Sequence, residues 1–423
     1  MMDWIFLTAG QEAFNMQTIN INRLKERLDK VNEIGAMPVG GVKRLALTDE
    51  DKLVRDLLKK WFDELNLTTL IDQAGNMVGT WKISNQNPVA IGSHLDTVGT
   101  GGLFDGSLGV VAGLEVLQTI IESGIKINKP LSVINFTNEE GVRFTPDMMG
   151  SYAFAGLGKI EDIWSAKAEE NQAINLIDEL KRTGYLGEVK CGSVNLDSYF
   201  ELHIEQGPVL EAENIQIGVV EKVQGINWTE YVFKGKANHA GTTPMRMRRD
   251  AGYVAASVSK HVRELTREIG GAQVGTVGIT EAFPNLINVI PERVRVTVDL
   301  RNTDKGQLLK AQRLLDEYVS QVSTEENVAV DRNELVRFDP VNFDPDMVNL
   351  IEQKSKALGY SSMRMPSGAG HDAQMMASIC STAMIFIQSK DGISHNIDEF
   401  SSDDAIEAGA NVLLNAVLEK LTS

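Results

Sequence analysis

The alternation of apolar and polar residues along this chain follows two periods, one helical and one extended. Apolar residues three and four positions apart predict helices at 18–35, 107–123, 249–269 and 306–323. Short apolar runs predict buried strands at 88–95, 131–137, 200–204 and 383–388. A further helix begins at Thr48-Asp-Glu-Asp51, which has the pattern of a helix-capping box. Helices and strands therefore alternate, which is typical of α/β folds.

The middle of the chain has a different pattern, with longer and half-exposed strands. Such strands are predicted at 228–236, 273–281, 292–301 and 328–338. Together with two of the helices they give the order β-α-β-β-α-β, which is typical of a ferredoxin-like domain. A length of 423 residues also favours two domains. We therefore predict a mixed-sheet α/β catalytic domain at 1–223 and 341–423, with an inserted α+β domain at 224–340.

Composition and charge narrow the class of protein. The chain is 43% hydrophobic and 23% charged, as globular proteins are, and its net charge is −17. This charge argues against nucleic acid and anionic membranes as partners, and no apolar run approaches the roughly 20 residues that span a bilayer. Cys191 and Cys380 match no metal-ligand spacing, so we expect reduced thiols in a cytoplasmic protein. The first residues carry Asp3 and lack a basic region, so we expect no signal peptide, with Met16 as a candidate natural start.

Three of the six histidines fall in short stretches that also supply carboxylates. The stretches are Gly92-Ser-His-Leu-Asp96, Leu103-Phe-Asp-Gly106, Asn138-Glu-Glu-Gly141, Leu202-His-Ile-Glu-Gln-Gly207 and Gly392-Ile-Ser-His-Asn396. Most of them follow a predicted strand, and open α/β sheets place their sites at the carboxyl ends of strands. Imidazole and carboxylate ligands without thiols suit zinc, manganese, cobalt or nickel. The five stretches together predict a centre for two divalent metal ions.

Five side chains of this set are candidate metal ligands. Asp105, in a glycine-rich turn, is the candidate bridge, because two neighbouring cations need a shared carboxylate to hold them against mutual repulsion. His94 and His203 would complete the ligands of one ion. Glu140 and His395 would complete those of the other.

Two further carboxylates beside these ligands remain free of metal. We expect Asp96 to accept the second ring N–H of His94 and so to orient that ring. Glu139 is the candidate general base toward the attacking water and then the acid toward the leaving amine. Taken singly, a His-x-Asp motif is more often structural and a Glu-Glu pair more often solvated surface. Here the pair directly follows a buried strand and the five stretches occur together, which favours the metal centre.

With these residues identified, the sequence resembles the aminoacylase/carboxypeptidase superfamily of two-metal hydrolases. More narrowly, it resembles the hydantoinase/carbamoylase branch, which contains N-carbamoyl-L-amino-acid hydrolases, β-ureidopropionases, and allantoate or ureidoglycolate amidohydrolases. The resemblance begins near residue 40 and continues to the carboxyl terminus, and its most specific blocks are 201–211, 238–244, 367–372 and 392–396. The ligand roles given above match the pattern of this branch, with Glu139 at its catalytic glutamate.

The resemblance implies features that the residues alone do not. The inserted domain would act as a lid and as the interface of a two-fold homodimer, and it would carry the substrate-binding residues His239, Asn288 and Arg301. His239 would also be catalytic, because it can donate to the developing oxyanion. Arg301 would bind a substrate carboxylate through its planar fork of donors. Further expected substrate-binding residues are Gln206, Gly368, Ala369 and Gly370. The cofactor would be two divalent ions per subunit, zinc or else manganese, cobalt or nickel.

The reaction implied is hydrolysis of the ureido C–N bond of an N-carbamoyl-L-amino acid or N-carbamoyl-β-alanine, giving the amino acid, carbon dioxide and ammonia. An allantoate or ureidoglycolate amidohydrolase is the alternative within the branch. A peptidase or aminoacylase of the wider superfamily is a second alternative, and a non-catalytic metal-binding protein a third. Gln206 and the block at 367–371 weigh against the peptidase. The complete set of ligands and base weighs against the non-catalytic protein.

Overall fold

The computed structural model describes residues 16–423, and it divides into two compact units. Among the described residues, unit 1 comprises 16–219, 346–363 and 378–423, and unit 2 comprises 220–345 and 364–377. The whole predicted insert, 224–340, belongs to unit 2. Residues 364–377, which the sequence analysis assigned to the catalytic domain, also belong to unit 2. The expectations for the segment before Met16 lie outside the described residues.

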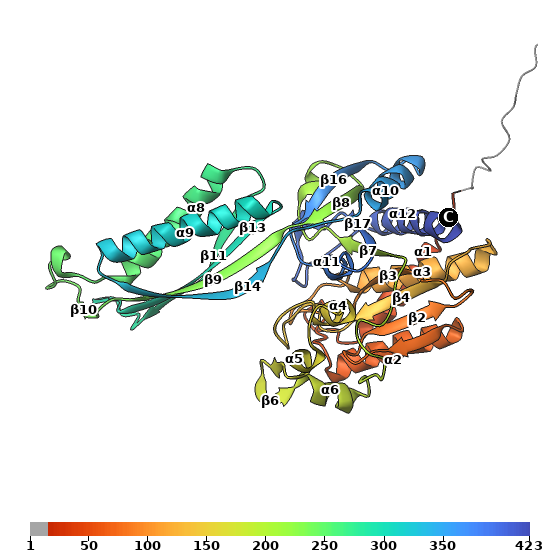
Figure 1. Ribbon diagram of the computed structural model, residues 1–423, viewed down its shortest axis with the longest axis horizontal. Coiled ribbons are helices and arrows are strands. Elements are labelled where there is room, and N and C mark those ends of the chain that lie inside the picture. Colours follow the sequence, from red (N-terminus) through yellow and green to blue (C-terminus); the bar gives the residue numbers. More distant parts are fainter. Residues whose placement is uncertain (1–15) are drawn as a thin grey trace, which may run out of the picture. The chain divides into compact units, whose positions relative to one another are not determined.

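Unit 1 is built around a mixed sheet with the strand order β1-β2-β4-β3-β7-β17 (Figure 1). Its strands are β1 (Thr68–Ile71), β2 (Met77–Trp81), β3 (Val89–His94), β4 (Leu131–Phe136), β7 (Ser198–Ile204) and β17 (Ser381–Ile387). The pairs β4–β3, β3–β7 and β7–β17 are parallel, whereas β1–β2 and β2–β4 are antiparallel. The parallel strands are buried almost throughout, as strands covered on both faces are. Four predicted strands are thereby confirmed.

The first two helices of unit 1 begin where their sequences provide caps. Asn20 caps α1 (Ile21–Glu33), and the Thr48 hydroxyl accepts from the backbone N–H of Asp51 at the start of α2 (Asp49–Glu64). The predicted helix at 107–123 is confirmed to the residue as α3. The remaining elements are α4 (Met149–Phe154), α5 (Ile160–Trp164), β5 (Lys167–Ala168), β6 (Asn171–Asn175), α6 (Leu176–Thr183), α7 (Val209–Ala212), α10 (Pro345–Ala357) and α12 (Asp403–Thr422).

Unit 2 has the predicted β-α-β-β-α-β order, and its four long strands form an antiparallel sheet in the order β11-β13-β9-β14. The elements are β9 (Gly225–Lys234), α8 (Ala251–Ile269), β11 (Val274–Phe283), β13 (Arg293–Asn302), α9 (Lys305–Glu325) and β14 (Ala329–Phe338). Every second residue of β13 is buried, and the apolar ones among them form one core with apolar residues of α8 and α9. The sheet therefore packs one face on both helices (Figure 1).

Several short elements complete the chain. The two-residue strands β10 (Asn238–His239) and β12 (Val289–Ile290) pair with each other in unit 2. In the sequence, β8 (Ile217–Val223) and β16 (Ser362–Ser367) cross the boundaries of the units, whereas β15 (Val341–Asn342) and α11 (Asp372–Met376) belong to unit 2.

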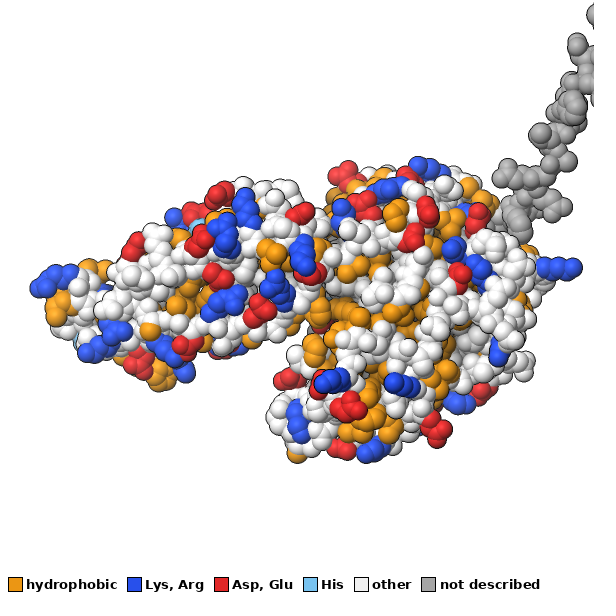
Figure 2. Space-filling view, in the orientation of Figure 1, with side chains coloured by type: hydrophobic (Ala, Val, Ile, Leu, Met, Phe, Trp, Pro, Cys, Tyr) orange, Lys and Arg blue, Asp and Glu red, His pale blue; other side chains and the backbone are white. Residues whose placement is uncertain are grey.

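Two surface properties bear on possible partners. No helix among residues 16–423 is both long and apolar enough to cross a bilayer. Figure 2 shows acidic and basic side chains interspersed over the visible face of each unit. On that face, the acidic side chains are mixed with basic ones rather than gathered in one patch.

Candidate metal centre

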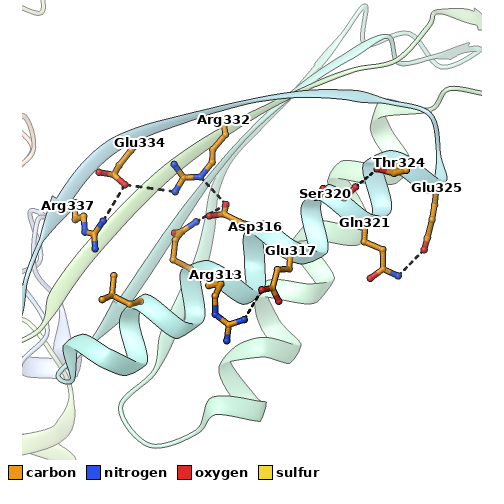
Figure 3. A pocket seen from close by; sticks show the side chains of 12 residues that line it. Arg313, Asp316, Glu317, Ser320, Gln321, Thr324, Glu325, Arg332, Glu334 and Arg337 are labelled. Carbon is orange, nitrogen blue, oxygen red and sulfur yellow. Dashed lines mark hydrogen bonds and ion pairs between the residues drawn. The ribbon is translucent and has the colours of Figure 1, made fainter.

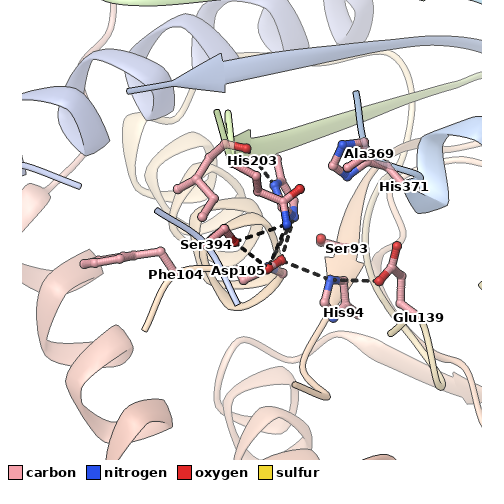
Figure 4. A network of polar contacts seen from close by, with 12 residues as sticks. Ser93, His94, Phe104, Asp105, Glu139, His203, Ala369, His371 and Ser394 are labelled. Carbon is pink, nitrogen blue, oxygen red and sulfur yellow. Dashed lines mark hydrogen bonds and ion pairs between the residues drawn. The ribbon is translucent and has the colours of Figure 1, made fainter. Parts of the chain in front are cut away.

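The candidate metal ligands meet at the carboxyl edge of the unit 1 sheet. His94 ends β3 and His203 lies near the end of β7, while Asp105 occupies the turn between β3 and α3. Because β3, β4 and β7 are parallel neighbours, the loops that follow them share one edge of the sheet. Six predicted side chains converge there: His94, Asp105, Glu139, Glu140, His203 and His395. Figure 4 shows His94, His203 and Glu139 around Asp105.

The Asp105 carboxylate faces two groups of donors, one with each oxygen. Its Oδ1 lies 3.2 Å from His203 Nε2 and 3.7 Å from His94 Nε2, whereas its Oδ2 lies 3.2 Å from His395 Nε2. His395 Nε2 is in turn 3.4 Å from Glu140 Oε2. Within each group, His94–Asp105–His203 and Asp105–Glu140–His395, the donor atoms lie within 4.8 Å of one another. One carboxylate shared by two such groups has the placement that a bridging ligand requires.

Main-chain carbonyls orient the two buried histidine rings. The Nδ1 atom of His94 lies 2.9 Å from the Asp96 carbonyl oxygen, and that of His203 lies 2.9 Å from the Ile204 carbonyl oxygen, so each ring directs Nε2 to the centre. The Asp96 carboxylate was the expected partner of His94, but it lies 3.9 Å from Nδ1. It instead accepts from the backbone N–H groups of Glu139 and Glu140, at 3.2 and 3.3 Å. Asp96 therefore orients the ring with its backbone and the glutamate pair with its side chain.

The turn that holds Asp105 depends on Gly106. This residue has φ +63°, and a Cβ atom built on it would overlap the His94 ring. Its backbone N–H also points at His203 Nε2, 3.3 Å away. Only glycine combines the left-handed conformation with this close approach.

The electrostatics of the centre reflect many buried carboxylates. Burial, together with the charges of Asp105 and Asp96, raises the pKa of Glu140 well above its usual range. Burial acts in the same direction on Asp105, but hydrogen bonds with two of the histidines outweigh it and lower the pKa of that carboxyl. Burial depresses the pKa of His94 to about 4, whereas Asp105 overcomes burial at His203 and raises its pKa to about 9. A cation at this position would lower the pKa values of Glu140 and His203 and so counter the shifts of these two groups. The nitrogen and oxygen donors present fit divalent ions.

Glu139 lies beside the donor groups without belonging to either of them. It is 8% exposed, and its Oε2 is 3.4 Å from His94 Nε2. Its backbone is held by the Asp96 carboxylate, so its position is set independently of a ligand bond. A carboxylate so placed can take up and return a proton.

Three neighbouring side chains hold the Asp105 turn. Gln206 Nε2 donates to Asp105 Oδ2 at 2.9 Å, so this residue, which was expected to bind substrate, also contacts the candidate bridge. The buried Oε1 of Gln206 has no hydrogen-bond partner in the described part of the chain. Ser394 Oγ lies 3.2 Å from the same oxygen, and Glu399 accepts from the backbone N–H of Asp105 at 3.1 Å. The sequence analysis gave no role to Ser394 or Glu399. Ser394 stands in one of the five stretches, but nothing in the local pattern distinguishes Glu399 from a solvated loop residue.

The other expected substrate-binding residues belong to unit 2. His239 lies exposed in β10, and its Nδ1 accepts from the backbone N–H groups of Gly241 at 3.0 Å and Thr242 at 3.2 Å. In the neutral ring the hydrogen must then be on Nε2, which makes that atom an outward-facing donor. Asn288 contacts the same segment, because its carbonyl accepts from the Ala240 N–H at 3.0 Å.

Arg301 lines a hollow of about 350 Å³ in unit 2, together with Asp299, Gly368 and three other residues. Its Nη1 donates to the carbonyl of Gly368 at 2.7 Å. Two of the expected substrate-binding residues, Arg301 and Gly368, are therefore in direct contact. Ala369 follows Gly368, and its backbone N–H donates to Ser367 Oγ at 3.1 Å.

A second hollow in unit 2, of about 920 Å³, lies between α9 and β14 (Figure 3). Its charged side chains largely satisfy one another. Arg313 pairs with Glu317 at 2.7 Å, and Arg332 pairs with Asp316 at 2.9 Å. It contains none of the predicted site residues, and its paired charges do not indicate a catalytic site.

Comparison with known proteins gives consistent similarities. The family model described as peptidase family M20/M25/M40 matches residues 90–419. The chain is 41% identical over 403 residues to an N-carbamoyl-L-amino-acid amidohydrolase of Rhizobium meliloti, a match that covers 95% of this chain and 96% of that protein. It is 39% identical over 404 residues to an N-carbamoyl-L-amino acid amidohydrolase of Geobacillus stearothermophilus, covering 93% and 97%. A crystal structure of a hydantoinase/carbamoylase family amidase from Burkholderia multivorans aligns with a TM-score of 0.91 and 41% identity, covering 96% of this chain and 99% of that one.

Proposed function

We propose that this chain, which belongs to peptidase family M20/M25/M40, is an amidohydrolase that cleaves the ureido C–N bond of N-carbamoyl-L-amino acids. The products are the amino acid, carbon dioxide and ammonia. Relatives at 39–41% identity over more than nine-tenths of the chain bear that name, which favours this substrate class over the allantoate or ureidoglycolate alternative.

The observation that carries the proposal is the different placement of the Asp105 and Glu139 carboxylates relative to the histidines. Asp105 presents one oxygen to His94 and His203 and the other to His395. Glu139 lies beside these donors and outside both groups. A carboxylate that lies beside a cation site without being a ligand can act as the general base toward water.

The centre would hold two divalent ions per subunit, zinc or else manganese, cobalt or nickel. Asp105 would be shared, with His94 and His203 on one side and Glu140 and His395 on the other. When bound, the ions would supply Lewis acidity and lower the pKa of water. The mixed nitrogen and oxygen donor set supports this assignment.

The residues of the chain then perform the proton transfers. Glu139 removes a proton from the attacking water, which adds to the carbamoyl carbon, and His239 offers its Nε2–H to the developing oxyanion. Glu139 returns the proton to the amine nitrogen as the C–N bond breaks. The carbamic acid that remains decomposes to carbon dioxide and ammonia. The substrate would be bound by Arg301, Gln206, Asn288 and the segment Gly368-Ala369-Gly370. Within this set, Arg301 would bind the carboxylate of the amino acid.

Assembly and location also belong to the proposal. We expect a homodimer formed through the insert at 224–340, because symmetric dimers are the commonest soluble assembly and the resemblance implies this interface. We expect a cytoplasmic location, because Cys191 and Cys380 form no disulfide within residues 16–423. Sedimentation equilibrium tests the dimer directly.

A substrate panel tests the function. The protein is stripped with a chelator, reloaded separately with zinc, manganese, cobalt or nickel, and assayed for ammonia and amine. The panel contains N-carbamoyl-L-amino acids with different side chains, their D enantiomers, N-carbamoyl-β-alanine, allantoate, ureidoglycolate and dipeptides. We expect the highest kcat/KM with an N-carbamoyl-L-amino acid. If allantoate or ureidoglycolate is the preferred substrate, the proposed substrate class is wrong and the alternative within the branch is correct. Amine release from dipeptides without turnover of any ureido compound would favour the peptidase.

A further inference from the structure

Glu399 is a buried carboxylate that the proposed chemistry does not use. It is 3% exposed and follows His395 by four residues. Its Oε1 accepts from the backbone N–H groups of Phe104 at 2.9 Å and Asp105 at 3.1 Å, and its Oε2 lies 2.9 Å from Ser394 Oγ. All of these partners belong to the two loops that carry Asp105 and His395.

These contacts join segments that are distant in sequence. The hydrogen bonds from Phe104 and Asp105 to Glu399 span 295 and 294 residues. Ser394 Oγ also lies 3.2 Å from Asp105 Oδ2, the oxygen that faces His395. Glu399 therefore holds the backbone of the candidate bridge on one side and, through Ser394, approaches its metal-facing oxygen on the other.

The turn leaves space for this carboxylate. A Cβ atom built on Gly102 would overlap the carboxyl group of Glu399. The absence of a side chain at residue 102 is thus what allows Glu399 to reach the N–H groups of Phe104 and Asp105. A buried carboxylate that accepts two N–H groups and a hydroxyl is satisfied by positioned donors rather than by water.

We propose that Glu399 is a positioning residue for the Asp105–Glu140–His395 half of the centre, acting through the backbone of Asp105 and the hydroxyl of Ser394. This rests on the proposed two-ion function. Residues that orient metal ligands without touching the ion typically change metal affinity by about 10- to 100-fold when they are removed. Asp105 serves both halves, but Ser394 approaches its Oδ2, the oxygen that faces His395, so the larger loss of affinity falls on the ion at the His395 half.

The experiment measures Zn²⁺ affinity separately for the two binding events of the metal-stripped, full-length protein, by competition with a chromophoric chelator. His395→Ala and His94→Ala identify which event belongs to which half. Glu399→Ala is expected to weaken the His395 event about 10- to 100-fold. The loss of affinity at the other event should be clearly smaller. Glu399→Gln keeps an acceptor for the two N–H groups and is expected to recover most of the loss.

Two further variants separate positioning from general stability. Ser394→Ala removes only the hydroxyl between Glu399 and Asp105 and should weaken the same event. Glu115→Ala is the matched control, because Glu115 is also a buried carboxylate of unit 1, and it lies within α3 and pairs with Arg23 of α1. It should lower the melting temperature and leave both affinities unchanged.

The outcomes are distinguishable. Wild-type protein that binds fewer than two ions overturns the proposed centre itself. If Glu399→Ala binds two ions with wild-type affinity, the proposed role of Glu399 is wrong. The same conclusion follows if both binding events lose affinity equally. Neither result contradicts the proposed metal centre. If Glu399→Ala does not fold, the test is made with Glu399→Gln and Ser394→Ala. An unchanged zinc affinity of the His395 event in Ser394→Ala then contradicts the proposed role of Glu399.

Discussion

Arg301 donates side-on to Asp299, two residues before it on β13. Its Nε lies 3.1 Å from both carboxylate oxygens, and its Nη2 lies 2.9 Å from Oδ2. The Asp299 carboxylate thus already orients the guanidinium that was expected to bind a substrate carboxylate. With Nη1 donating to the Gly368 carbonyl, a ligand must approach the remaining N–H groups of Nη1 and Nη2.

Arg301→Ala should raise KM for substrates with a carboxylate and leave kcat less affected, because the charge of that carboxylate does not change during the reaction. A hydrogen bond to a charged group contributes about 1.5–3 kcal/mol, which corresponds to roughly 10- to 150-fold in KM. Steady-state kinetics with the carboxylate substrate and its primary amide measures the effect, which should vanish for the amide. Arg295→Ala, on the same strand and paired with Glu230, is the control. An unchanged KM in Arg301→Ala would exclude the proposed role.

Glu139→Gln should retain both metal ions and lose turnover. Loss of a general base typically costs about 10²- to 10⁴-fold in kcat. Metal content measured on the same preparation as the activity decides the assignment, with Glu140→Gln as the comparison that should lose metal. If Glu139→Gln also loses metal, Glu139 is a ligand and the division of roles is wrong.

Metal binding should release protons at neutral pH. In the metal-free protein, Asp105 holds the pKa of His203 at about 9 against the effect of burial, and the pKa of Glu140 is raised well above its usual range. Both groups must be deprotonated to bind a cation, so affinity should fall as the pH decreases below about 9. Titration calorimetry in buffers of different ionisation enthalpy counts the protons. Zero release at pH 7 would contradict the protonated state of His203.

Gly106→Ala should destabilise the protein and displace His94. A non-glycine residue in the left-handed region costs about 1–2 kcal/mol, and here the new Cβ also meets the imidazole. Gly124→Ala is the matched control, because Gly124 has φ +66° and open space around its Cβ position. Chemical denaturation should show that both variants are less stable than the wild type. Zinc binding should show a loss of affinity in Gly106→Ala but not in Gly124→Ala. Equal affinity in the two would show that the glycine serves the turn alone.

The principal helices and strands, and the identity of the reactive side chains, can be predicted from the sequence. The sequence predicts the helix at 107–123 to the residue, because a long apolar run is bounded by the turn at Gly106 and by Gly124. It also predicts the element order of the insert, since periodicity and breaker residues act over short distances. The carboxyl-terminal helix α12 is absent from the predictions, because it is buried around most of its circumference and its amphipathic period is weak.

The contacts that these side chains make with one another depend on the tertiary structure. Residues 364–377 belong to unit 2, Asp96 holds His94 with its carbonyl rather than its carboxylate, and Arg301 is paired with Asp299. Glu399 reaches Asp105 across 294 residues of sequence. Hydrogen bonds depend on direction and on distances of about 3 Å. That geometry is set by the packing of loops that are far apart in the chain, and a local pattern of apolar and polar residues does not encode it.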